Sequence, residues 1–131
     1  MTNKKSLWWA DWVLRIAIAG EFIGHGVFAL QGKEGWFKYF YSFGITSDET
    51  IVFLLFLVGI MDILLAIHIL VRPVRIVVLW MAIWALWTAL IRWPLGPDPV
   101  WDFLERWANW GAPLALILIH GWPKKWKEWL R

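Results

Sequence analysis

Long apolar runs alternate with short polar connections along this chain, and the pattern predicts four helices. The runs cover about residues 7–30, 51–71, 74–91 and 100–120. Each is close to the roughly 20 residues with which an α-helix crosses the ~30 Å hydrocarbon core of a bilayer. We therefore predict an all-α membrane protein in which residues 1–131 form a single domain, a bundle of four transmembrane helices.

The connections carry local signals of their own. Between the first two runs, Trp36, Phe40 and Phe43 recur at helical spacing, which predicts a short helix lying in the membrane interface. Residues 47–50 then offer capping and acidic side chains to the next helix. The dipeptide Arg72-Pro73 leaves a very short turn, so we expect the helices on either side to be antiparallel neighbours.

The last segment, residues 121–131, predicts an amphipathic tail that rests on the membrane surface. Trp122, Trp126 and Trp129 fall on one helical face, and lysines occupy the others, as expected beside an anionic leaflet. Lys and Arg also concentrate before the first run and in the turn at residues 72–75. Because positive charge marks the cytoplasmic side, we expect both termini to be cytoplasmic and the two longer connections to face outward.

Composition supports a membrane protein and narrows its chemistry. The chain is 60% hydrophobic, and its 14 tryptophans suit the boundary between lipid and water. The lipid bilayer is thus the first expected partner, and a net charge of only +3 gives no reason to expect nucleic acid. The absence of cysteine excludes disulfides, thiolate metal sites and iron–sulfur clusters.

Ionisable residues within the apolar runs are the candidates for function. Glu21 and His25 lie one turn apart on one face of the first helix, and Asp62 lies near the middle of the second. Such groups are costly in a membrane and usually face a bundle interior or a wet cavity. With the expected orientation, polar residues of all four helices share the outer half of the membrane, which predicts an outward-facing polar pocket. Its candidates are Glu21, His25, Asp62, Arg92, Glu105, Arg106 and Asn109, walled by Trp87, Trp107 and Trp110.

The same residues have simpler interpretations. Buried charges that neutralise one another can serve only to hold helices together, and Glu105-Arg106 can be an interfacial pair. A di-iron site needs Glu-x-x-His on two helices, whereas Glu-x-x-x-His occurs here once, so we predict no metal site. Haem b has only His68 and His120 as candidate ligands, and each is equally well an interfacial histidine. No residue is identified as catalytic.

Several short motifs make the chain similar to a known family. Arg15, the run Glu21–Gly26 and the glycine-acid pattern of Val58–Asp62 resemble the DoxX-like proteins, small four-helix proteins of bacterial and archaeal inner membranes. Gly35-Trp36 and Phe43-Gly44-Ile45 extend the resemblance into the first connection. It implies a helical bundle associated with redox chemistry, in some members as the membrane subunit of a thiosulfate:quinone oxidoreductase. It also implies that His25 is a functional position, and that Glu21 and Asp62 are the next candidates.

Two functional hypotheses follow. In the first, the chain is a redox-linked membrane subunit that binds a quinone in the polar pocket, where Glu21, His25 or Asp62 exchanges protons with the headgroup. In the second, it is a non-catalytic accessory subunit that packs against other membrane-protein subunits, and its charges only hold helices together. The abundance of Trp along residues 74–91 supports the second hypothesis.

Overall fold

The computed structural model describes residues 3–131, and within that range all regular elements are helices. The predicted all-α class is therefore confirmed. The four longer helices are α1 (Lys4–Leu30), α3 (Asp48–Val71), α4 (Arg75–Leu90) and α6 (Trp107–Ile119). The short elements are η1 (Glu34–Trp36), α2 (Phe37–Tyr41), α5 (Val100–Leu104) and α7 (Trp126–Trp129).

Two of these helices are long and apolar enough to cross a membrane. They are α1, with 27 residues, and α3, with 24 residues. At about 1.5 Å per residue, both exceed the ~30 Å of a hydrocarbon core. Helix α4 has 16 residues and α6 has 13, so each is shorter than that core by itself.

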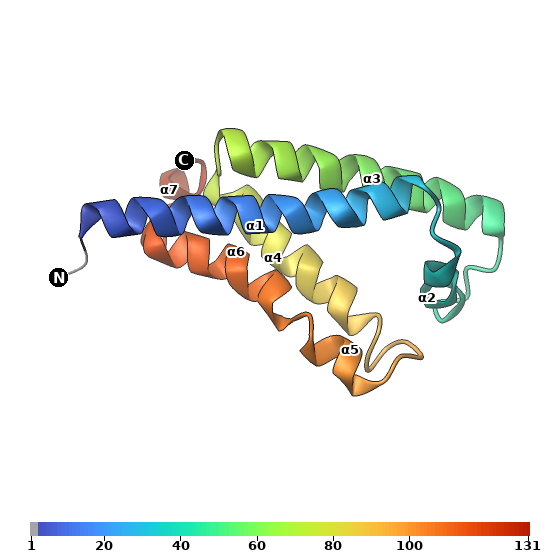
Figure 1. Ribbon diagram of the computed structural model, residues 1–131. Helices are drawn as coiled ribbons and strands as arrows, with labels where there is room; N and C mark the ends of the chain where they lie inside the picture. Colours follow the sequence, from blue (N-terminus) through green and yellow to red (C-terminus); the bar gives the residue numbers. More distant parts are fainter. Residues whose placement is uncertain (1–2) are drawn as a thin grey trace.

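The two ends of the bundle differ in charge. We call the end formed by residues 4–15, 72–75 and 120–131 the basic end, and the end formed by residues 31–47 and 91–106 the loop end. Figure 1 shows both termini and α7 at the basic end, with α2 at the loop end. The basic end carries most of the lysines and arginines, whereas acids and bases are equal in number at the loop end.

Helix starts are capped where the sequence indicates. The Asn3 side chain accepts a hydrogen bond from the backbone of Lys5, and the Ser47 side chain accepts one from the backbone of Thr50. Asp48 and Glu49 add negative charge to the first turn of α3, where the helix dipole favours it. The predicted capping of the second long helix is confirmed.

Backbone carbonyl groups at the end of α3 accept hydrogen bonds from a side chain of a neighbouring helix. Arg15 of α1 donates through Nε to the carbonyl of Ile69, at 2.8 Å, and through Nη2 to the carbonyl of Leu70. These carbonyls belong to the last turn of α3, which has no further helix to supply donors. Arg15 therefore fastens α1 to α3 at the basic end.

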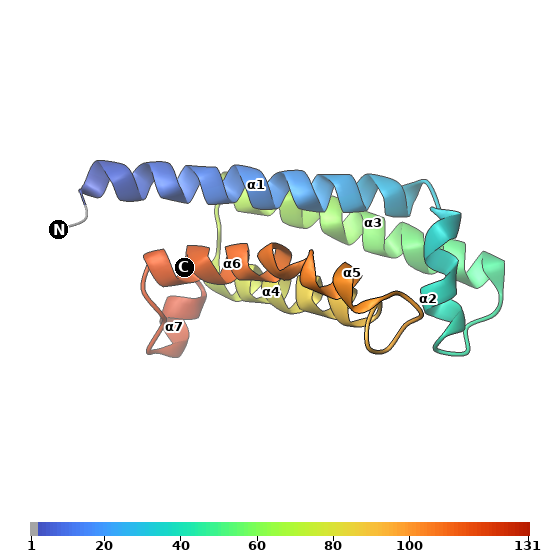
Figure 2. The ribbon, with the colours of Figure 1, turned by 60° about the horizontal axis from the view of Figure 1, so that its bottom comes forward.

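The helices pack in pairs rather than in sequence order. Helix α1 packs against α3 and, less extensively, α6, while α4 packs chiefly against α6. Helices α3 and α4 are antiparallel, as the short turn predicts, but they diverge from that turn and have few close approaches (Figures 1 and 2). They are neighbours at that turn and in the main core, whereas α2 and a cavity lie between them at the loop end.

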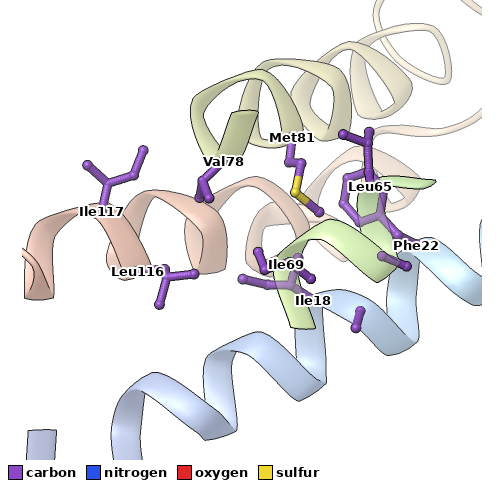
Figure 3. Packing of buried hydrophobic residues seen from close by; sticks show 10 residues of the cluster. Ile18, Phe22, Leu65, Ile69, Val78, Met81, Leu116 and Ile117 are labelled. Carbon is purple, nitrogen blue, oxygen red and sulfur yellow. The ribbon is translucent and has the colours of Figure 1, made fainter. Parts of the chain in front are cut away.

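The main core lies where all four long helices converge. Ile18 and Phe22 of α1 meet Ile69 of α3, Met81 of α4 and Leu116 of α6 (Figure 3). These side chains are almost completely buried, and removing their apolar surface from solvent drives the packing. A smaller cluster of Ala29, Ile51 and Leu55 forms at the loop end.

The predicted helix over residues 100–120 is interrupted. It ends as α5 at Leu104, turns through Glu105 and Arg106, and resumes as α6 at Trp107. Backbone bonds of the tighter i to i−3 type replace the helical ladder there, from Arg106 to Phe103 and from Asn109 to Arg106. The prediction of one uninterrupted helix over residues 100–120 is therefore wrong.

The tail also differs from its prediction. Only Trp126–Trp129 is helical, and the preceding segment is irregular around the buried Pro123. Trp122 packs its ring edge-on against Trp129, whereas Trp126 remains 69% exposed. Proline removes a backbone donor and prevents one continuous amphipathic helix over residues 121–131.

Helices α1 and α3 approach most closely at Gly26 and Gly59. A methyl group built on Gly59 would lie 2.9 Å from the carbonyl oxygen of Gly26 and 2.6 Å from Leu30. One built on Gly26 would lie 3.2 Å from the carbonyl oxygen of Gly59. Glycine at both positions thus lets two backbones touch, which is how helices pack closely in membranes.

We expect Gly59→Ala to lower the free energy of unfolding by about 1–3 kcal/mol, because the new methyl group would push α3 away from α1. Denaturant titration in mixed micelles, followed by circular dichroism, measures this change. Gly24→Ala is the matched control, since nothing lies within 4 Å of a methyl group there. Equal effects of the two substitutions would contradict the close contact.

Candidate functional site

A cavity lies at the loop end, between the diverging helices α3 and α4. Its volume is about 280 Å³, and its surface is almost entirely apolar. Helix α1 contributes only His25 to the lining, whereas η1, α2 and the segment that follows α2 contribute several residues. The lining residues are His25, Trp36, Tyr39, Phe40, Phe43, Ile45, Leu55, Val58, Asp62, Trp84, Trp87, Thr88, Ile91 and Arg92.

Aromatic residues of the first connection form one wall. Trp36, Phe40 and Phe43 all line the cavity, so the helical spacing that predicts a common face places them on a common surface. The predicted short helix is present as η1 and α2, and Tyr39 of α2 is buried. Its aromatic face is directed to the cavity, and Phe43 also contacts Trp87 of α4, with ring centroids 5.8 Å apart.

Two charged residues are buried in this apolar wall. Asp62 of α3 is 2% exposed, and Arg92, just after α4, is 5% exposed. Neither forms an ion pair with another described residue, and Asp62 Oδ1 and Arg92 Nε have no hydrogen-bond partner. Unpaired buried polar atoms are rare and costly in folded proteins. The two atoms without partners, Asp62 Oδ1 and Arg92 Nε, are therefore the strongest sign of a ligand site.

A polar network holds the α2 wall against the loop that follows α4. Arg92 donates through Nη1 to the Tyr39 hydroxyl, which donates to Asp98 at 2.5 Å. Lys38 donates to the other oxygen of Asp98, also at 2.5 Å. Burial raises the pKa of Asp98, but the hydrogen bonds from Lys38 and Tyr39 outweigh it and hold that pKa below its ordinary value. The carboxylate thus remains charged and keeps the network intact.

His25 is the point at which the cavity meets the interrupted helix. Its Nε2 lies 3.2 Å from Nη1 of Arg106, at the turn between α5 and α6. The His25 ring also lies edge-on to Trp36, with centroids 5.7 Å apart. His25 and Arg106, both candidates for the predicted pocket, therefore lie within hydrogen-bond distance of each other.

The rest of the predicted cluster is dispersed. Of the ten predicted residues, the cavity is lined by His25, Asp62, Arg92 and Trp87. Glu21, Asn109 and Trp110 are partly buried outside it, and the Glu105 side chain is 64% exposed. Trp107 is 49% exposed and packs on Phe103 and Trp110. The expected mutual neutralisation is reduced to one long Glu105–Arg106 contact of 4.0 Å, because α3 and α4 diverge and the helix breaks at Arg106.

A second polar network, which the sequence did not predict, lies at the basic end. Asp11 of α1 contacts His120 at 2.6 Å and Arg15 at 3.4 Å. The signal was available, since Asp11 and Arg15 have helical i, i+4 spacing. His68, the other histidine considered for haem, accepts a hydrogen bond at Nε2 from the backbone of Val74. Both histidines therefore already use Nε2 for protein contacts.

The sequence also offers no indication of four other polar or aromatic residues near the site, which are Tyr39, Trp84, Thr88 and Asp98. Within residues 3–131, no three His, Asp or Glu side chains gather as a metal site would require.

Comparisons with known protein families, curated proteins and solved structures find no match to this chain. The resemblance to DoxX-like proteins is therefore carried by its short motifs alone.

We expect Asp62→Leu to raise the free energy of unfolding of the ligand-free protein by on the order of 1 kcal/mol, because it removes an unpaired buried oxygen. The same denaturant titration measures this change. Asp11→Leu is the control and should lower stability, since Asp11 is hydrogen-bonded to His120 and Arg15. A loss of stability in Asp62→Leu would mean that Asp62 only holds helices together.

Proposed function

We propose that this chain is a multi-pass membrane protein that binds a quinone-like molecule in the cavity between α3 and α4. One observation carries the proposal. Asp62 and Arg92 are more than nine-tenths buried in an apolar, aromatic wall, and each keeps a polar atom without a partner. Small-molecule sites are typically apolar cavities with a few such convergent polar groups.

The cavity matches a flat, mostly apolar molecule with oxygens on its ring. Its volume of about 280 Å³ is close to the lower limit of ~300 Å³ for small-molecule sites, so it suits a headgroup better than a complete lipid. Trp36, Trp84 and Trp87 offer indole surfaces against which a ring can pack. Arg92 supplies a donor for a carbonyl oxygen, and Asp62 supplies an acceptor for the hydroxyl of the reduced form.

The redox role rests on the resemblance to DoxX-like proteins. In this proposal the chain provides the quinone site, and partner subunits in a bacterial or archaeal inner membrane provide the electrons. The competing proposal is an accessory subunit without a ligand. It is favoured by one observation, the outward stripe of Trp80, Ile83 and Trp87 along α4, each at least 40% exposed.

Four membrane crossings are part of the proposal. Helix α4 and the α5–α6 pair would cross beside α1 and α3, with the basic end in the cytoplasm. The excess of Lys and Arg at that end supports this orientation. A protein that crosses only through α1 and α3 would keep α4 and the loop after it on the cytoplasmic side.

Single cysteines distinguish these topologies, because the chain has no cysteine of its own. We expect Glu34→Cys and Pro97→Cys to be labelled in intact cells by a maleimide that cannot cross membranes. Lys125→Cys should react only after the cells are opened. Labelling of Glu34→Cys without Pro97→Cys would instead indicate two crossings.

We expect Val58→Phe to weaken binding of a short-chain quinone at least tenfold, because the larger side chain would fill the cavity that Val58 lines. Calorimetric titration of the protein in lipid nanodiscs measures the affinity. Val71→Phe is the matched control, since Val71 lies on the same helix and is 77% exposed. Circular dichroism checks that both variants keep their helices.

Binding that survives Val58→Phe would place the quinone outside this cavity. If the wild-type protein binds no quinone and purifies within a larger assembly, the accessory-subunit proposal replaces this one. Replacement of Trp80 and Trp87 should then release the chain from that assembly.

A further inference from the structure

The contact between Arg106 and His25 fixes the chemical form of the histidine ring. A guanidinium group has only donors, so at 3.2 Å the Nε2 atom of His25 must be the acceptor. An imidazole that accepts at Nε2 is neutral and carries its proton on Nδ1. The geometry therefore assigns one of the two neutral forms of this ring.

The interrupted helix is what brings Arg106 to this position. At the turn between α5 and α6, the Glu105 side chain points outward and is 64% exposed, whereas that of Arg106 is 19% exposed. The Glu105 oxygen lies 4.0 Å from Arg106 Nη2, beyond hydrogen-bond distance. Arg106 Nε has no partner, so the contact with His25 is the one hydrogen bond of the guanidinium to another described residue.

The opposite side of the His25 ring remains available. His25 lines the cavity, and no hydrogen bond joins its Nδ1 to another described residue. Its neighbour Trp36 lies edge-on to the ring and lines the same cavity. His25 thus lines the cavity with an Nδ1 atom that has no partner among the described residues, as Arg92 does with its Nε.

We infer that Arg106 is a positioning residue that holds His25 as a neutral Nδ1–H donor, and that His25 donates this hydrogen bond to a ligand oxygen. This inference rests on the proposed quinone site and makes it more specific. A ligand needs an accepting oxygen to satisfy His25 and Arg92, so a carbonyl compound should bind better than a hydrocarbon ring of equal size. Asp62, as an acceptor, serves a different part of the ligand.

Nitrogen NMR of the full chain in lipid nanodiscs tests the form of His25 without any ligand. The protein carries ¹⁵N in its three histidines, and His25→Gln identifies the His25 signals by their loss. At neutral pH we expect a protonated Nδ1 and an unprotonated Nε2 for His25 in the wild-type protein. A protonated Nε2, or a doubly protonated ring, would overturn the inference.

Variants of Arg106 then test the positioning role. Arg106→Leu should let the His25 ring take the other neutral form and should weaken quinone binding about tenfold, the value of one hydrogen bond. Arg106→Lys retains a donor and should restore both properties. Arg72→Leu is the control, because Arg72 is exposed at the basic end and does not line the cavity.

The outcomes separate the two proposals. A changed ring form in Arg106→Leu with unchanged quinone affinity would overturn the donor role of His25. If the wild-type protein binds no quinone, the quinone site fails, and so does donation to that ligand, while the NMR signals still decide the form that Arg106 imposes on the ring.

Discussion

The contact between Gly26 and Gly59 is the constraint on which the rest of the structure depends. Because α1 and α3 touch backbone to backbone there, α3 follows α1 along its length instead of following α4, its neighbour in sequence. Helix α4 then pairs with α6, and the two pairs remain joined mainly through the large core. The space left between them at the loop end is filled only in part by α2, and the remainder is the cavity.

The polar groups around that cavity fall into two sets with different roles. The first set, Arg92, Tyr39, Asp98 and Lys38, is linked by hydrogen bonds and holds the α2 wall in place. The second set consists of atoms without protein partners, Asp62 Oδ1 and Arg92 Nε. Arg92 belongs to both sets, since its Nη1 donates to the Tyr39 hydroxyl whereas its Nε has no partner. A protein that needed these charges only for cohesion would be expected to pair them, as it pairs Asp11 with His120.

Local features of the fold are predictable from the sequence, and long-range ones are not. Helical periodicity and capping residues identified α1, α3 and α4 to within a few residues, as well as the shared surface of Trp36, Phe40 and Phe43. His25 and Asp62 were found because charge is conspicuous in an apolar run. The pairing of helices was missed, because it depends on how closely Gly26 and Gly59 approach in space. The interruption at Arg106 was missed because no proline or glycine marks it, and Asp98 was missed because loops carry no periodic pattern.

The attachment of the tail by Arg75 has a consequence for how the protein is made. This residue, at the first position of α4, donates to the carbonyls of His120 and Glu128, which follow it by 45 and 53 residues. A ribosome therefore completes α4 long before the partners of its first residue have been synthesised. Until they emerge, the Arg75 guanidinium cannot form either of these hydrogen bonds, and the tail cannot be attached to the start of α4. The basic end is therefore assembled only after the tail has been synthesised, although Arg75 lies in the middle of the chain.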